Sequence, residues 1–168
     1  AMALEFDGVE LPRLEVPRER WDTALASMSA ELRRDLEEAA ANILAFHRAQ
    51  VPQDMEVQVR PGVTLGRRAV PLARAGTTPM RTLLGYDARP PGAYTPTRAA
   101  GVEDIVVCSP PGPGGEPPDS VLAACAIAGA SRLFALGGAG AVAALAFGTE
   151  TVPRVDAIVG PGNRWVTE

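Results

Sequence analysis

The sequence predicts an α/β protein in which a parallel sheet follows an N-terminal helical arm and a β-hairpin. Short apolar runs and small-residue helical segments alternate in the second half in a β-α-β-α-β order, which is typical of a parallel sheet with crossover helices. Residues 55–70 alternate around the turn signal Pro61-Gly62, which predicts a hairpin. We therefore expect residues 1–54 to form an arm and helix, and residues 55–168 to form a partial α/β domain.

The N-terminal elements are read from prolines and helical spacing. Pro12 and Pro17 make residues 1–20 an extended arm. Apolar residues then recur at intervals of three and four over residues 23–50, which predicts one long helix with a buried face, ended by Pro52. The residues of that face are Leu32, Leu36, Ala40, Ile43, Leu44 and His47.

The second half supplies the predicted sheet. Residues 105–108 form a continuous apolar run, as expected of a strand covered on both faces. Asp119-Ser120 can cap the next helix and Gly129 can end it. The remaining elements are a strand at 132–136, a helix at 140–147 and a strand at 155–159. Residues 76–97 contain four prolines, so we expect an irregular loop there instead of a crossover helix.

Composition excludes several classes of protein. The formal net charge is −4 and the arginines are scattered, so the basic patch of a nucleic-acid binder is absent. No apolar run reaches the roughly 18 residues that a membrane span needs, and no signal peptide is evident, so we expect a cytoplasmic protein. Cys108 and Cys125 lie in apolar segments without a C-x-x-C pair, which favours buried thiols.

Two glycine-rich segments are candidates for ligand binding. Residues 138–143 match G-x-G-x-x-A between a predicted strand and helix, so Gly138 is a candidate for a dinucleotide site; close packing of helix on strand explains the pattern equally well. Gly160, Gly162 and Asn163 follow the last strand at its carboxyl end, where open parallel sheets bind ligands; the alternative is a tight turn. His47, the single histidine, reads as a half-buried helix residue, and no cluster has the spacing of a zinc site.

Four stretches resemble histidinol dehydrogenase: RDLEEAAANILAFHRAQ, RPGVTLG, AGVEDIVVCSPP and, most distinctively, GGAGAVAALAFGTETVPRVDAIVGPGNRWVTE. The resemblance implies an incomplete Rossmann-like sheet and a homodimeric enzyme. That family oxidises L-histidinol to L-histidine in two NAD-dependent steps with one zinc ion. Asn163 corresponds to a family contact with NAD.

The chain departs from the family pattern at three places. Gly140 stands where the family has a Gln in the NAD site. Tyr94 lies in a partial match to the family's G-x-Y-x-P-G-G, which occurs later in this sequence than in the family. The sequence also ends before the positions of the family's zinc ligands and proton-transfer residues. We therefore expect weak or lost NAD binding, no zinc ligands and no activity from this chain alone.

Two other functions remain open from the sequence. One is a binding module that holds a nucleotide without turnover, and the other is a split subunit that needs a second polypeptide. For the family reading we expect a small-molecule substrate, NAD and a homo-oligomer. We expect its contact near residues 140–147 or 155–159, because a partial family domain exposes apolar surface.

Overall fold

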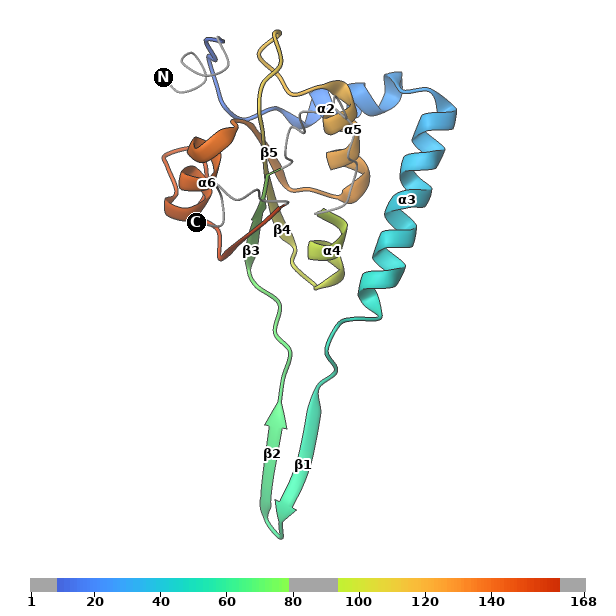
Figure 1. Ribbon diagram of the computed structural model, residues 1–168, viewed down its shortest axis with the longest axis vertical. Helices are drawn as coiled ribbons and strands as arrows, with labels where there is room; N and C mark the ends of the chain where they lie inside the picture. Colours follow the sequence, from blue (N-terminus) through green and yellow to red (C-terminus); the bar gives the residue numbers. More distant parts are fainter. Residues whose placement is uncertain (1–8, 79–93, 161–168) are drawn as a thin grey trace.

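A computed structural model describes residues 9–78 and 94–160; for Tyr94 it describes the backbone alone. Within these ranges the sheet lies between α6 on one face and α2, α4 and α5 on the other (Figure 1). The helices are α2 (Arg18–Ser27), α3 (Ala30–Arg48), α4 (Tyr94–Ala99), α5 (Asp119–Ala128) and α6 (Gly138–Phe147). The strands are β1 (Met55–Arg60), β2 (Val63–Arg67), β3 (Arg74–Thr77), β4 (Asp104–Ser109), β5 (Arg132–Ala135) and β6 (Ala157–Val159).

The main sheet has the order β5-β4-β3-β6 in the described ranges, and each neighbouring pair is parallel. The chain adds β4 and β5 on one side of β3, then crosses back to add β6 on the other. This reversal is the topological switch of doubly wound sheets, and it lies between β3 and β6. The predicted α/β class and parallel sheet are confirmed.

The central strand β3 was not predicted. The irregular loop expected at residues 76–97 is wrong at both ends, because β3 extends to Thr77 and α4 begins at Tyr94. The intervening residues 79–93 lie outside the described ranges. A four-residue strand that contains Gly76 has little intrinsic strand preference; pairing with β4 and β6 on its two sides stabilises it.

The side chains of β4 alternate between two apolar cores. Ile105 and Val107 pack toward α5, whereas Val106 and Cys108 pack toward α6. All four are at most 1% exposed, so β4 is covered on both faces as predicted.

Helix α5 confirms one predicted end and corrects the other. Gly129 ends the helix with φ 74°, the left-handed conformation that glycine adopts without strain. At the start, the N-cap residue is Pro118, which makes no side-chain cap, and Asp119 is already the first helical residue; the predicted cap at Asp119-Ser120 is therefore wrong. The helix packs against α2, where Trp21 is 1% exposed.

The single helix predicted at residues 23–50 is two helices, α2 and α3. The chain breaks at Met28 and Ser29, where the Ser29 hydroxyl accepts a hydrogen bond from the Leu32 amide at 3.2 Å. Within α3, Leu36 alone is buried and Leu32 is 46% exposed. The predicted apolar stripe exists, but most of it is only half-buried, namely Ala40, Ile43, Leu44 and His47.

The N-terminal arm joins the edge of the sheet. The Val16 amide donates to the Leu133 carbonyl at 2.8 Å, and the Ala135 amide donates to the Leu14 carbonyl at 2.7 Å. Glu15 accepts two hydrogen bonds from the Arg132 guanidinium, at 2.8 and 2.7 Å. The arm therefore covers the open edge of β5.

The predicted hairpin is confirmed. Strands β1 and β2 pair antiparallel around Pro61-Gly62, with Gly62 at φ 77°, and project away from the sheet (Figure 1). Every residue of both strands is exposed. None of the helices in the described ranges is long and apolar enough to cross a membrane.

We predict that Glu15→Gln weakens attachment of the arm in a pH-dependent way. The hydrogen bonds from Arg132 lower the pKa of Glu15 below its usual 4.5, so the carboxylate stabilises the fold above that pH and loses this effect as pH falls through its folded pKa. Because the pair is partly exposed, we expect Glu15→Gln to lower the free energy of unfolding by about 1 kcal/mol or less at pH 7.

Urea denaturation at pH 7 and pH 3 measures this effect. The difference between the wild-type chain and Glu15→Gln should shrink at pH 3. Glu38→Gln on the exposed surface of α3 is the control and should change neither value. An equal loss at both pH values would contradict the account.

Candidate functional site

The carboxyl edge between β3 and β6 is the candidate site. Loops at the carboxyl ends of parallel strands hold ligands in open α/β sheets, at the point where strand order reverses. Thr77 ends β3 and pairs with Val159, which ends β6. The residues that follow, Thr78 and Gly160, therefore leave the sheet side by side.

Gly160 is in close contact with Thr78. A Cβ at position 160 would lie 2.9 Å from the Thr78 carbonyl oxygen and 3.2 Å from its hydroxyl oxygen. A side chain of any kind would force the two backbones apart. Glycine at 160 thus lets the backbones that follow β3 and β6 lie in close contact at this edge.

Gly138 lies at the carboxyl side of β5, at the start of α6. Its φ is 61°, and a Cβ there would meet nothing within 4 Å, so its backbone conformation and not close packing favours glycine. The close approach occurs at Gly137, where a Cβ would lie 2.5 Å from the Pro110 side chain. The first amides of α6 have no intrahelical acceptors and are suited to an anion.

The two glycine segments are widely separated in the sheet. β5 and β6 are its outer strands, three strand spacings apart, which corresponds to about 14 Å. A ligand that contacts both Gly138 and Gly160 must therefore be extended.

The structure describes only part of the other predicted site residues. Gly162 and Asn163 lie outside the described residues. Tyr94 is the first residue of α4, and its side chain is also outside the description. The structure therefore brings Gly160 to the switch point and Gly138 to the end of β5.

Thr77 and Thr78 were not predicted as site residues. Both fell in the segment read as an irregular loop, because the prolines that follow β3 masked a short strand. The hydroxyl of Thr77 is buried and lacks a hydrogen-bond partner in the described part of the chain. The available sequence signal was Arg-Ala-Gly-Thr-Thr directly before a proline, which is a weak pattern.

Ionisable side chains give little chemistry to this edge. Burial raises the pKa of Cys108 to about 12, so its thiol stays protonated and unreactive at neutral pH. His47 is half-buried on α3, edge-on to Phe46 with ring centroids 5.4 Å apart, as the sequence predicted. Within residues 9–78 and 94–160, no group of three or more His, Cys, Asp or Glu could hold a metal ion.

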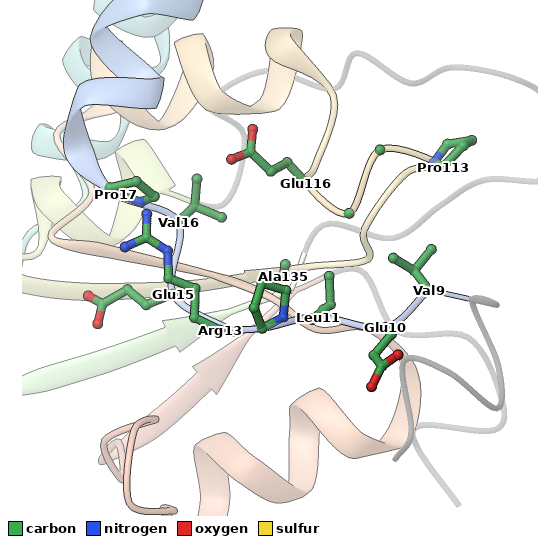
Figure 2. Close-up of a pocket in the computed structure, with 13 residues that line it drawn as sticks. Val9, Glu10, Leu11, Arg13, Glu15, Val16, Pro17, Pro113, Glu116 and Ala135 are labelled. Atoms are coloured by element: carbon green, nitrogen blue, oxygen red, sulfur yellow. The ribbon is translucent and has the colours of Figure 1, made fainter.

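A cavity of about 330 Å³ lies elsewhere, between the arm at residues 9–17 and the loop at 113–116 (Figure 2). Two of its three carboxylates are already engaged, since Glu116 accepts from Arg20 at 2.7 Å and Glu15 pairs with Arg132. Neither Gly138 nor Gly160 lines it. We therefore place the candidate site at the sheet edge.

Comparison with known proteins identifies the family. The family model described as histidinol dehydrogenase matches residues 1–168. The chain belongs to the histidinol dehydrogenase family. The histidinol dehydrogenase of Methanosarcina mazei is 47% identical over 166 residues, covering 97% of this chain, and that of Xylella fastidiosa is 40% identical over 172 residues.

The fold agrees with this membership. A crystal structure of histidinol dehydrogenase from Elizabethkingia anophelis covers 99% of this chain with a TM-score of 0.85 and 29% identity. This chain spans 38% of the length of that protein and of the two histidinol dehydrogenase relatives named above.

We predict that Gly160→Ala lowers the free energy of unfolding by about 1 to 3 kcal/mol, because the new Cβ overlaps the Thr78 carbonyl. Gly114→Ala is the matched control, since a Cβ there meets nothing within 4 Å, and it should change the value by less than about 0.5 kcal/mol. Urea denaturation measures both. Equal stability of the two variants would show that the β3–β6 edge is not closely packed.

Proposed function

We propose that this chain is the dinucleotide-binding part of a histidinol dehydrogenase that oxidises L-histidinol to L-histidine with NAD. The observation that carries the proposal is the β3–β6 edge, where the topological switch and the glycine-held backbone occur together in a chain of this family. We infer a cytoplasmic location, as befits a small-molecule biosynthetic enzyme.

The described residues fit a dinucleotide in part. The unpartnered Thr77 hydroxyl and the adjoining backbones of Thr78 and Gly160 offer polar contacts at one end, and the first turn of α6 offers backbone amides at the other. Bound NAD would supply the hydride acceptor, and this chain's residues would hold and orient it. Asn163 and Gly140 stand at positions where the family has side chains that contact NAD, and Tyr94 stands near such a position. Gly140 offers no side chain for this contact.

The zinc chemistry of the family does not fit the residues described for this chain. They contain no cluster able to hold the ion, and His47 is the single imidazole of the 168 residues. We propose that these residues alone bind the cofactor without turnover.

Exposed apolar side chains support assembly with a second copy of the chain. Phe147 is 84% exposed at the end of α6, and Ile158 and Val159 are 37% and 42% exposed on the edge strand β6. An edge strand with unpaired backbone groups and apolar side chains is a site for association.

We predict weak NAD⁺ binding by the 168-residue chain. Loss of one neutral hydrogen bond costs about 1 kcal/mol, or roughly fivefold in affinity, so Gly140→Gln should strengthen binding by about that factor. Asn163→Ala should abolish measurable binding. Isothermal titration calorimetry with NAD⁺ measures both, and tight binding that survives Asn163→Ala would place the cofactor elsewhere.

We further predict an oligomer through the α6–β6 surface. Light scattering of the wild-type chain should give at least twice 17.5 kDa, and Phe147→Arg should lower the apparent mass. The control is Phe46→Arg, which changes an exposed side chain on α3 that is 66% exposed. A wild-type monomer across a wide concentration range would refute this assembly.

A further inference from the structure

Thr77 lies on an inner strand of the sheet, at the carboxyl edge that forms the candidate site. It is the last residue of β3, it pairs with Val107 of β4 and Val159 of β6, and it is 1% exposed. Strand alternation sets it on the face opposite Gly76, which packs against α6 through Leu145. The hydroxyl therefore lies on the α4–α5 side, at the carboxyl end of the central strand.

Packing does not explain a hydroxyl at this position. Valine has the same branched shape as threonine, and the buried neighbours Val106 and Val107 show that valine suits this sheet. The Thr77 hydroxyl has no hydrogen-bond partner in the structure as described for residues 9–78 and 94–160. A buried polar group without a partner destabilises the fold relative to an apolar isostere.

The position of the hydroxyl suggests the missing partner. Thr77 immediately precedes Thr78, whose backbone meets Gly160 where β3 and β6 leave the sheet. This is the switch point at which open parallel sheets hold ligands. A ligand seated there would lie against the carboxyl ends of β3 and β6, and Thr77 is the last residue of β3.

We propose that Thr77 is a ligand-binding residue whose hydroxyl donates a hydrogen bond to a ribose or phosphate oxygen of a nucleotide bound at the β3–β6 edge. Both groups are rich in acceptor oxygens, and a hydroxyl can rotate its proton toward either. The proposal rests on the proposed dinucleotide function and adds a residue to it. It also predicts opposite effects of one substitution on stability and on binding.

Thr77→Val is the decisive variant, tested in the 168-residue chain by urea denaturation and by calorimetric titration with NAD⁺. We expect a higher urea midpoint, because the unpaired hydroxyl is gone, and an affinity for NAD⁺ roughly fivefold to tenfold weaker, because one hydrogen bond to the ligand is lost. Thr77→Ser keeps the hydroxyl and should bind within about twofold of the wild-type chain, since the donor remains.

Thr95→Val is the matched control. Thr95 is also buried with an unpartnered hydroxyl in the described structure, but it lies in α4 and not on the sheet. It should raise the urea midpoint and leave the NAD⁺ affinity unchanged.

The outcomes separate the two proposals. Wild-type binding that Thr77→Val leaves unchanged would overturn the role of Thr77 and leave the dinucleotide function intact. A wild-type chain that does not bind NAD⁺ at all would overturn both. A lower urea midpoint or loss of folding in Thr77→Val would show that the hydroxyl is already paired in the free protein, which also overturns the role.

Discussion

Close packing of α6 on the centre of the sheet, at Gly76, is the constraint on which the rest of the structure depends. A Cβ at position 76 would lie 3.0 Å from both terminal methyls of Leu145 and 3.1 Å from a methyl of Val155. Glycine in β3 lets the helix approach the strand this closely. The Val155 amide then donates to the Leu145 carbonyl at 2.9 Å, which ties the chain leaving α6 to the helix itself.

The packing of α6 on Gly76 determines where β6 lies, and the pairing of β6 with β3 determines the position of the candidate site. With α6 held over β3, the chain reaches the free side of β3 and pairs there, so that Ala75 and Thr77 align with Ala157 and Val159. Strand order reverses at this place, and the carboxyl ends of β3 and β6 open together. The glycines at 76 and 160 both permit close approach: the first lets α6 pack on β3, and the second lets the chain after β6 lie against Thr78.

Much of this arrangement follows from local sequence, and the remainder depends on tertiary contacts. The apolar run of β4, the Gly129 terminator and the Pro61-Gly62 turn each have a local physical cause, and each is found where the sequence predicts it. The strand β3 is only four residues long and contains Gly76, so no local pattern marks it; its neighbours in the sheet stabilise it.

The candidate site divides in the same way. Gly138 and Gly160 stand out in the sequence because glycine-rich turns after apolar strands are typical of loops that bind phosphate groups. Thr77 could not be predicted, because its interest depends on burial and on a missing partner, which are properties of the folded chain. Likewise, the helical spacing of α3 is visible in the sequence, but its exposure is not, since periodicity identifies an apolar face without showing what covers it.

The most direct test of the site is a titration of the ¹⁵N-labelled chain with NAD⁺, followed by amide chemical shifts. We expect concentration-dependent shifts of the amides of Thr77, Thr78 and Gly160 and of those in the first turn of α6. Shifts confined to the arm at residues 9–17 and the loop at 113–116, which line the separate cavity, would contradict it.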